Sequence, residues 1–577
     1  MKRIWHIKEH APGLDSDAEK LAAETGVAPL VCRLLIERGI KSPDEVKAFF
    51  RPSLQAIGDP FLMRDMDKAV ARLNRAMGFK ERILVYGDYD VDGCTAVALV
   101  YRFLQQYYSN IDYYIPDRYD EGYGVSKQGI DYAHQTGVSL IIILDCGIKA
   151  VEEIAYAKSI GIDFIICDHH VPDEQLPNAV AILNTKRPDD TYPYKDFSGC
   201  GVGFKLIQAF AISNGIPFSQ LTPLLDLVAV AIAADIVPIM GENRVLAYHG
   251  LRQLSQNPSV GMRAVIDLCG LTGRDITMSD IIFKIGPRIN ASGRMQNGKV
   301  SVELLVEHNY ARACELAQQI NTYNEERKEL DKRMTEEACS MVRAMEQTRQ
   351  HSAIVICNET WHKGVIGIVA LRLTETFMKP AVVLTRSGQV VTGSVRSVAQ
   401  FDVYKAIQHC QDLLLNFGGH TYAAGLTLPP QNVEAFEQRF EQYVATHLEE
   451  QPSEPIINID GILSLRDITR KLHTDLRRMR PFGPGNNKPI FCARQTFDYG
   501  TSRVVGRRQE HIKLELIDSH RSTPISGIAF GQSAYARYVK SKHPFDIAFS
   551  IEDNNHKHGE PQLLIQDIME TELPADT

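Results

Sequence analysis

Short apolar runs in the first half of the chain each stop at an aspartate. Continuous runs of aliphatic and β-branched residues of this length are typical of strands buried on both faces of a parallel sheet. Their alternation with helical segments between residues 60 and 240 predicts a doubly wound α/β sheet. The carboxyl ends of parallel strands share one edge of a sheet, so we expect the aspartates to converge there. The runs are residues 83–86, followed by Asp88, residues 140–144, followed by Asp145, and residues 164–167, followed by Asp168.

The first of these strand ends carries aspartates at alternating positions. In GDYDVDG, the side chains of Asp88, Asp90 and Asp92 would point the same way along an extended chain, so their carboxylates would share a small volume. Like charges that close cannot all stay ionised unless cations lie between them, and Mg²⁺ or Mn²⁺ is the usual partner of such a cluster. The alternative for this motif alone is an acidic turn exposed to solvent.

Histidines and a further aspartate add to this cluster. Asp168 is followed by His169 and His170, and Asp235 lies in the apolar stretch 224–240, which we interpret as another strand end. Each residue has a local explanation, since the aspartate after the second run could cap a helix, the histidines could be hydrogen-bonded in a loop, and Asp235 could be a buried, hydrogen-bonded carboxylate. Together they favour one site of carboxylate and imidazole ligands for two metal ions.

Four motifs further along the chain extend the pattern. They are PDRYDEGYG (116–124), PRINASGR (287–294), WHKGVIGIVA (361–370) and GGHTYAAG (418–425). With GDYDVDG, LDCG, DHH and Asp235, they resemble the successive motifs of the DHH phosphoesterase family, in order and over nearly the whole chain. The resemblance implies a metal-dependent 5′→3′ exonuclease that degrades single-stranded DNA to 5′ mononucleotides in recombination and repair.

The resemblance also implies roles within the acidic cluster. It implies two ions, Mn²⁺ or Mg²⁺, bridged by Asp145, and two ions about 3.5 to 4 Å apart can clamp the attacking and leaving oxygens of a phosphoryl displacement. Asp92 would support the turn without binding an ion, His170 would face the scissile phosphate, and Asp168 would fix the loop. Many members of the family place a histidine ligand in the first motif, whereas this strand has none. The implied metal ligands are Asp88, Asp90, Asp145, His169 and Asp235, and the implied catalytic residues are Asp145, Asp168, His169 and His170.

Small and basic residues in the second half of the chain suit phosphate binding. GSVRS offers backbone N–H groups together with the hydroxyl of Ser394 and the guanidinium of Arg396. Gly418 and Gly419 would let a phosphate approach the backbone closely, next to His420. The alternative for the glycine pair is tight packing at an alanine-rich helix start.

Residues of two earlier motifs would extend this phosphate-binding surface. Arg288, Asn290 and Arg294 lie in PRINASGR, and Arg118 lies in PDRYDEGYG, where it could instead pair with a neighbouring acidic residue. The resemblance implies a pocket that grips the 5′ terminal phosphate at a fixed distance from the metal ions, which would make the enzyme an exonuclease instead of an endonuclease. The implied pocket residues are Arg118, Arg294, Ser394 and Arg396.

Length and composition bound the architecture and the compartment. With 577 residues the chain is too long for a single core and should divide into three or four domains. The net charge of −8 argues against a non-specific nucleic-acid coat protein but not against a nuclease, because bound metal neutralises carboxylates. The eleven cysteines form no C-x-x-C pair, the start lacks the apolar core of a signal peptide, and no apolar stretch is long enough to span a membrane. We therefore expect a cytoplasmic protein that does not bind membranes.

A long helix and a linker are expected to separate the parts of the chain. Glycine and proline are absent from 299 to 363, and apolar residues at helical spacing, interrupted by Arg327, predict a long helix there. It could be a strut between two domains, an interface helix or, less readily given the broken seam, a coiled coil. The acidic stretch 449–455 suits a linker. The expected parts are a helical lead-in (1–50), a DHH catalytic domain (51–300), the connecting helix (301–350), a DHHA1-type α/β domain (351–448) and an OB-fold barrel (456–577).

The last part of the chain combines strand-like runs with basic and aromatic residues. Runs such as HIKLELID and FDIAFSI, separated by turns, predict a small β-barrel, with a sandwich as the alternative. Basic side chains interleaved with aromatic ones suit a single nucleic-acid strand, and a solvated basic face is the alternative. The candidate contacts are Arg477, Arg478, Arg480, Phe482, Arg503, Arg507 and Arg508.

Two other functions fit parts of the pattern. A phosphodiesterase for short oligonucleotides or cyclic dinucleotides would need only the two α/β domains, so the barrel argues against it. A non-catalytic DNA-binding scaffold would have lost metal ligands, whereas the implied ligand set is complete here. The resemblance implies single-stranded DNA as the substrate and, as protein partners, a single-strand-binding protein and a RecQ-type helicase. We expect the chain to act as a monomer.

Overall fold

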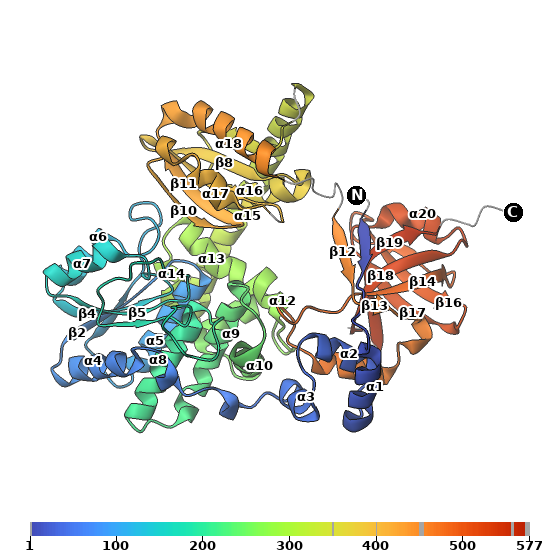
Figure 1. Cartoon of the computed structure of the whole chain (residues 1–577), viewed down its shortest axis with the longest axis horizontal. Helices are drawn as coiled ribbons and strands as arrows, with labels where there is room; N and C mark the ends of the chain where they lie inside the picture. The colour runs from blue at the N-terminus through green and yellow to red at the C-terminus, as the bar shows by residue number, and fades with distance from the viewer. Residues whose placement is uncertain (1–2, 349–350, 400, 449–454, 555–558, 572–577) are drawn as a thin grey trace. The chain divides into compact units, whose positions relative to one another are not determined.

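The computed structural model describes residues 3–348, 351–399, 401–448, 455–554 and 559–571, so the predicted linker at 449–455 lies outside these ranges except for its last residue. The chain forms two compact units (Figure 1). One comprises Met1–Gly58, Ile236–Tyr248 and Glu454–Thr577, and the other comprises Asp59–Asp235 and His249–Ser453. None of the described helices is both long enough and apolar enough to cross a membrane.

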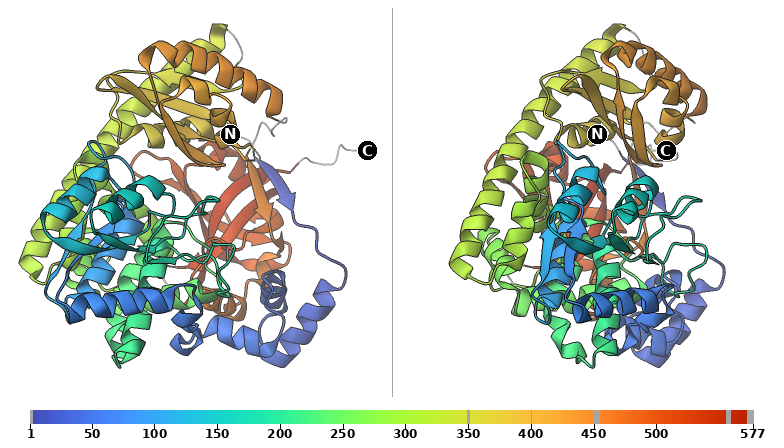
Figure 2. Two further views of the ribbon diagram at one scale, coloured as in Figure 1. Left: turned by 60° about the vertical axis from the view of Figure 1, so that its left-hand side comes forward. Right: turned by 90° about the vertical axis from the view of Figure 1, so that its left-hand side faces the viewer.

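The first α/β domain is built on a five-stranded, all-parallel sheet in the order β3-β2-β4-β5-β6. Helices α5 and α8 cover one face of the sheet, and α6 and α7 cover the other (Figures 1 and 2). The predicted doubly wound sheet is therefore confirmed. The bounds are β2 Arg82–Gly87, β3 Ile111–Tyr114, β4 Val138–Leu144, β5 Asp163–Cys167, β6 Ala181–Leu183, α4 Met66–Gly78, α5 Val91–Leu104, α6 Lys127–Gln135, α7 Val151–Ser159 and α8 Gly199–Ser213.

A layer of helices follows this sheet, and it corrects one prediction. Asp235 does not follow a strand, because the preceding residues form the buried helix α9 and Asp235 is its C-cap. A continuous apolar run looks alike in a buried strand and a buried helix, and only its length and its alanines favour the helix. The helices are α9 Leu225–Ala234, α10 Gly241–Gln256, α11 Val260–Leu268, α12 Met278–Asp280, a π-helical turn Ile281–Ile285, α13 Gly286–Met295 and α14 Lys299–Val306.

The predicted long helix is α15, Tyr310–Thr348, with 39 residues. Its first half packs against α11 and α13. In its second half, Met334, Ala338 and Val342 are buried against Val365 and Val369 of the second α/β domain. Because its apolar side is covered by its own chain on both halves, α15 is an interface helix that joins two domains and needs no coiled-coil partner.

The second α/β domain has a mixed sheet in the order β10-β11-β9-β8-β7. GGHTYAAG forms a hairpin of β10 and β11, so the interpretation of this motif as a helix start is wrong. A Cβ at Gly419 would lie 2.5 Å from the carbonyl oxygen of Ala423, so the glycine is needed for the close strand pairing. The bounds are β7 Ile354–Cys357, β8 Ala381–Ser387, β9 Val390–Arg396, β10 Asn416–His420, β11 Ala423–Leu428, α16 Ile366–Phe377, α17 Val403–Gln408 and α18 Val433–His447.

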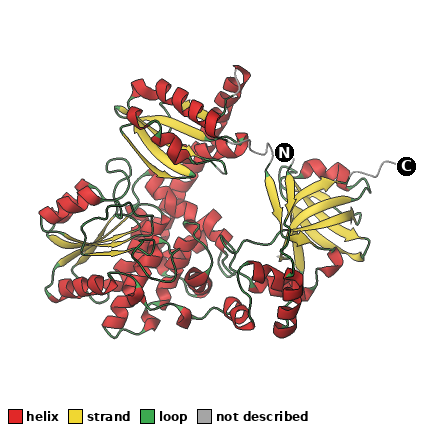
Figure 3. Cartoon of the chain, viewed as in Figure 1, coloured by secondary structure: helices red, strands yellow, loops and turns green. Residues whose placement is uncertain are grey.

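The C-terminal strands form a closed five-stranded barrel (Figure 3). The order β14-β18-β19-β17-β16 is closed by antiparallel pairing of β16 with β14, which decides for the predicted barrel and against a sandwich. Strand β14 was not among the predicted runs, because its charged and polar residues interrupt the alternation of apolar and polar side chains that marks a strand. The bounds are β13 Gly461–Ile462, β14 Phe491–Asp498, β15 Arg503–Val505, β16 His511–Asp518, β17 Arg521–Ala529, β18 Phe545–Asp553, β19 Pro561–Glu570, α19 Arg470–Arg478 and α20 Ala536–Val539.

The N-terminal lead-in belongs to the same unit as the barrel. Its helices are α1 Leu14–Thr25, α2 Pro29–Glu37 and α3 Pro43–Phe50. Leucines of α1 and α2 share a core with leucines of α19. A strand that the sequence analysis did not predict, β1 Ile4–Ile7, pairs in parallel with β12 Ile456–Ile459. The lead-in is therefore fixed to the C-terminal part by both backbone and side-chain contacts.

Candidate active site

The three alternating aspartates of the first strand end occupy different environments. Asp90 caps α5, with its Oδ1 accepting a hydrogen bond from the Gly93 N–H at 3.0 Å. Both oxygens of Asp92 accept backbone N–H groups at the start of α8, from Gly199 at 2.6 Å and Cys200 at 2.8 Å. By contrast, Oδ1 of Asp88 is buried and accepts no hydrogen bond from any described residue. The carboxylate that local structure leaves unsatisfied is therefore that of Asp88.

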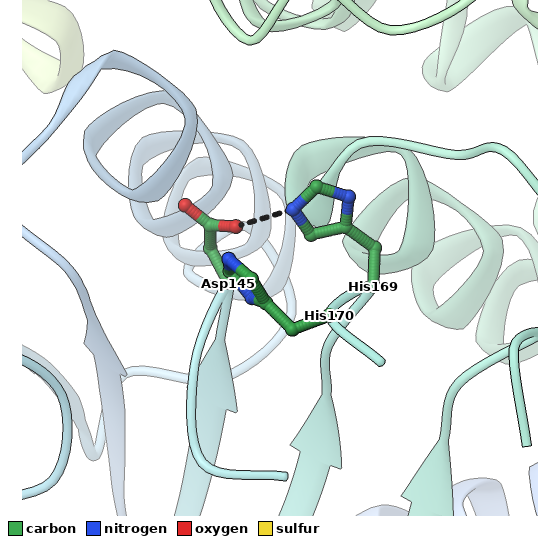
Figure 4. Close-up of side chains that lie close together, drawn as sticks. All are labelled: Asp145, His169 and His170. Atoms are coloured by element: carbon green, nitrogen blue, oxygen red, sulfur yellow. Dashed lines mark ion pairs between the residues drawn. The ribbon is translucent and has the colours of Figure 1, made fainter. Parts of the chain in front are cut away.

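The ends of β4 and β5 are tied together by Asp168. Its Oδ2 accepts a hydrogen bond from the Ile148 N–H at 2.9 Å, after β4. Its Oδ1 accepts the N–H groups of His169 at 2.7 Å and His170 at 3.1 Å. Asp145, at the end of β4, has a positive φ of 61°, which is uncommon outside glycine. The backbone is thus bent so that Asp145, His169 and His170 face one another (Figure 4).

The imidazole of His169 points its unprotonated nitrogen at two carboxylates. Its Nδ1 lies 2.9 Å from the carbonyl oxygen of Phe197, which can only accept, so Nδ1 carries the proton. Its Nε2 lies 3.2 Å from Oδ1 of Asp145 and 3.6 Å from Oδ2 of Asp235. Burial and the neighbouring His170 lower the pKa of His169 to about 3, so the ring is neutral near pH 7. A lone pair facing two carboxylates needs a proton or a cation between them, and a divalent cation satisfies all three groups at once.

Two groups of three residues could each hold a metal ion, because the ligand atoms within each group lie within 4.8 Å of one another. His169 belongs to both groups. Asp88 and Asp90 belong to neither group, although both carboxylates act to raise the pKa of Asp145. Burial, then Asp90, raises the pKa of Asp88 well above its usual value, and burial, then Asp92, does the same for Asp145. Several carboxylate and imidazole groups this close together are suitable ligands for Mn²⁺ or Mg²⁺. The groups are Asp145, His169 and His170, and Asp92, His169 and Asp235.

We expect the affinity for Mn²⁺ to rise with pH between 6 and 8. Burial and Asp90 raise the pKa of Asp92 to about 7, and burial and Asp92 raise that of Asp235 to about 8. Of these two, Asp235 is the expected ligand: its carboxyl holds a proton at pH 6 that an ion must displace, whereas at pH 8 about half of it is ionised. One displaced proton gives about a tenfold change in affinity per pH unit, so binding should be at least about tenfold weaker at pH 6. Calorimetric titration of Mn²⁺ at both pH values measures this, and equal affinities would contradict it.

His170 is held in place by a hydrogen bond to Asp168. Its Nδ1 lies 2.7 Å from Oδ1 of Asp168. Burial alone would lower the pKa of His170, but the bond to Asp168 outweighs it and the net shift is upward. Burial is likewise outweighed at Asp168, where the bond from His170 lowers the pKa to about 2. The His170 ring stacks on His420 of the second α/β domain, with 6.1 Å between centroids and 7° between planes.

Four arginines gather beside this cluster. The guanidinium of Arg118 lies 5.0 Å from the centre of the Tyr89 ring and forms no ion pair with Asp120 or Glu121 among the described residues. Burial, then Arg118, Arg327 and Arg396, lowers the pKa of Arg294 to about 10. This concentration of positive charge in a buried place suits a phosphate group.

The second α/β domain contributes to the same place. Nη1 of Arg396 donates to Oγ of Ser394 at 3.2 Å. A Cβ built on Gly367, at the start of α16, would lie 2.9 Å from that Oγ and 3.2 Å from Nη2 of Arg396. A β-strand hydroxyl, a guanidinium and a side-chain-free helix start therefore meet at one point, as the sequence analysis expected for Ser394 and Arg396.

Other predicted phosphate contacts are divided. Arg288 is directed elsewhere, because its guanidinium donates to the Lys284 carbonyl at 2.7 Å and to Asn321 at 3.0 Å. Asn290 lines a cavity together with Arg294 and Arg327. Gly418 has open space where a side chain would be. Arg327 was not among the candidates, and the signal that marks it is its interruption of the apolar spacing of α15.

The basic candidates of the barrel unit also divide. Arg477 and Arg480 pair with Asp553 at 3.2 and 2.7 Å, and Arg478 pairs with Asp475 at 3.3 Å, so structural ion pairs engage all three. Phe482 packs against the barrel core. The side chains that are exposed on and after β15 are those of Arg503, Arg507 and Arg508.

Comparison with known families matches three parts of the chain. A model described as the DHH family, N-terminal domain, matches residues 82–232. A DHHA1 domain model matches residues 350–446, and a RecJ OB domain model matches residues 459–567. The residues that build the cluster around His169, except Asp235 just beyond the first match, and the Ser394–Arg396 strand lie within the first two matches.

Relatives and solved structures extend the match to nearly the full length. The single-stranded-DNA-specific exonuclease RecJ of Bacillus subtilis is 34% identical over 98% of this chain and 71% of its own, and that of Escherichia coli K12 is 31% identical over 94% and 96%. A crystal structure of Thermus thermophilus RecJ in complex with Mn²⁺ has a TM-score of 0.83 at 25% identity over 99% of this chain and 80% of its own. A structure of exonuclease RecJ bound to manganese is 31% identical over 70% of this chain and 97% of its own, with a TM-score of 0.59. With this identity over almost the whole length of both chains, the protein belongs to the RecJ family of single-stranded-DNA-specific exonucleases.

Proposed function

We propose that the chain is a metal-dependent exonuclease that degrades single-stranded DNA from its 5′ end and releases 5′ mononucleotides. The observation that carries the proposal is the unprotonated Nε2 of His169, 3.2 Å from Asp145 and 3.6 Å from Asp235, next to a buried arginine cluster. A divalent ion satisfies the first feature and a phosphate satisfies the second. A nucleic-acid strand bound together with metal ions would therefore satisfy both the metal-binding cluster and the arginine cluster.

The metal-binding role is proposed for five residues. Two ions, Mn²⁺ or Mg²⁺, supply Lewis-acid stabilisation of the charge that develops on the scissile phosphate. Asp145 lies at the centre, since Asp88, Asp90, Asp92 and Asp235 all act on its pKa. Asp92 gives both its oxygens to α8 and so holds the helix in place behind the ligands. The proposed ligands are Asp88, Asp90, Asp145, His169 and Asp235.

The remaining residues of the site position the strand. Asp168 keeps His170 protonated and fixes its ring, so that Nε2 of His170 can donate to an oxygen of the scissile phosphate. The imidazole of His420 stacks on that ring and limits its rotation. The 5′ terminal phosphate is held by Arg118, Arg294 and Arg396 together with Ser394. Its fixed place beside the metal ligands means that the cut falls after the terminal nucleotide.

Single-strand selectivity follows from the approach of the two α/β domains. The rings of His170 and His420, one from each domain, are 6.1 Å apart between centroids. A further contact joins them where Nη1 of Arg294 donates to the Gly364 carbonyl at 3.3 Å. Such close contacts between the domains favour entry of one strand over a duplex. The exposed arginines on and after β15 are proposed to hold the strand upstream of the cut.

The proposal predicts a strong preference for single strands. With Mn²⁺ present, a 5′-phosphorylated single strand should be digested about 100-fold faster than a blunt duplex of the same sequence, because opening the two terminal base pairs costs about 1.4 kcal/mol each and about 2.8 kcal/mol corresponds to that factor. A chelator should stop both reactions. Equal digestion of the duplex, or intact single strands in the presence of Mn²⁺, would be incompatible with the proposal.

The proposal also covers the location of the protein, its oligomeric state, its partners and its domain limits. The eleven cysteines are all unpaired, which supports a reducing, cytoplasmic location. The covered apolar side of α15 supports a monomer. Work beside a single-strand-binding protein and a RecQ-type helicase in recombination and repair is supported by family membership. We keep the division at 1–50, 51–300, 301–350, 351–448 and 456–577 as the proposed domain limits.

A further inference from the structure

A cavity of about 170 Å³, open to solvent, lies beside the cluster around His169. Its apolar walls include Ala234, Pro287 and Ile368, and its polar lining is Asn290, Arg294 and Arg327. Ala234 directly precedes Asp235, and Ile368 directly follows Gly367, which faces Ser394 and Arg396. The cavity thus spans the interval between the proposed metal ligands and the proposed phosphate pocket.

Buried donors on α15 lack acceptors in this region. Nε of Arg327 is buried and donates to no described residue. Asp331 forms a long ion pair with Nη1 of Arg327, at 3.9 Å, because Arg372 holds its carboxylate through bonds of 2.9 and 2.8 Å. Asn324 accepts from Arg327 at 3.2 Å, yet its own Nδ2 is buried without a partner. Buried donors are normally satisfied, so this part of α15 is built for an acceptor that comes from a ligand.

We infer that this cavity receives the nucleobase of the 5′ terminal nucleotide, with Arg327 donating to an acceptor on the edge of the base. The inference rests on the proposed exonuclease function and deepens it. A phosphate in this cavity would lose hydration against the apolar walls without gaining contacts there. A base instead offers apolar faces to Pro287 and Ile368 and acceptors to Asn290 and Arg327. One nucleotide separates the terminal phosphate from the scissile one, and the cavity lies in that interval.

A double-mutant cycle between protein and substrate tests the inference. The protein arm compares the unaltered chain with Arg327→Met, which keeps the apolar stem of the side chain, and the substrate arm compares a normal 5′-phosphorylated strand with one whose terminal nucleotide is a stable abasic analogue. Arg327→Met should lower kcat/KM about tenfold on the normal strand and less than about twofold on the abasic strand. Arg333→Ala, an exposed arginine on the same helix, is the control and should behave like the unaltered chain on both strands.

Three outcomes would overturn the inference. They are an equal loss on both strands, which indicates a structural or phosphate-binding role, no loss on either strand, and a dependence on the base at the second position instead of the first. If Arg327→Met lowers the melting temperature, Asn290→Ala provides the same cycle from the opposite wall and must show the same coupling to the terminal base. Failure of the unaltered chain to cut the normal strand would instead refute the proposed function, so the two failures are distinguishable.

Discussion

Replacing Asp145 by asparagine should lower the rate of strand cleavage at least about 1000-fold, since the Lewis-acid contribution of bound metal is worth several kcal/mol and 4 kcal/mol corresponds to about that factor. Asparagine is the sharpest change, because it tolerates the positive φ of 61° at this position, whereas alanine would add backbone strain. Strand binding should persist, because the arginine cluster is untouched. Single-turnover cleavage and a separate binding titration measure the two effects.

The same variant should change stability in the opposite direction. Burial and the surrounding aspartates hold the pKa of Asp145 well above its usual value, so its charge destabilises the metal-free protein above the unfolded-state pKa near 4. An amide removes that charge, so the metal-free variant should melt at the same temperature as the unaltered chain or higher, and Mn²⁺ should no longer raise it. Asp44→Asn, at an exposed position of α3, is the matched control. Unchanged cleavage by Asp145→Asn would refute the metal assignment.

Replacing Arg396 by methionine should cost about 100-fold in kcat/KM on a 5′-phosphorylated strand, because a charged hydrogen bond to a phosphate contributes up to about 3 kcal/mol. Arg396 donates to Ser394 and lies against the start of α16, so its guanidinium is fixed before the strand arrives. Methionine retains the apolar stem and removes only the charged end.

The substrate provides the control for this second variant. On a strand with a 5′ hydroxyl, the unaltered chain should already be slow, and Arg396→Met should lower its rate less than about threefold, since the group that Arg396 binds is absent. Parallel measurements on the two strands isolate the terminal phosphate from general DNA binding. A loss of equal size on both strands would show that Arg396 contacts another part of the DNA.

The fold was largely predictable because local pattern and tertiary role agree in most of the chain. Strands β2, β4 and β5 each contain an unbroken apolar run, residues 83–86, 140–144 and 164–167, as strands covered on both faces of a sheet do. The topology of a parallel sheet then brings Asp145 and His169 together, whatever lies between them in sequence. Asp235 shows the limit of this argument, since it arrives from the end of a buried helix that has the same apolar pattern as a strand.

The finer arrangement of the site could not be predicted because it depends on partners distant in sequence. The alternation of Asp88, Asp90 and Asp92 does not by itself distinguish them, and only the family resemblance implied a supporting role for Asp92, both of whose oxygens accept from α8, more than 100 residues later. Likewise, Asp553 neutralises Arg477 and Arg480, which looked like free DNA contacts in the sequence. In the sequence, Arg327 only interrupts the apolar residues at helical spacing. The packing of α13 against α15 shows that it lines a cavity.

The most direct test of the account is the identity of the first product released from an end-labelled strand. A 5′-phosphorylated single strand should be labelled at its 5′ phosphate in one sample and at its 3′ end in another, and each should be incubated with Mn²⁺-loaded protein. The 5′ label should appear at once as a mononucleotide, while the 3′ label should stay on strands that shorten progressively and be released last. Early release of the 3′ label, or labelled fragments from internal cuts, would contradict a 5′ exonuclease.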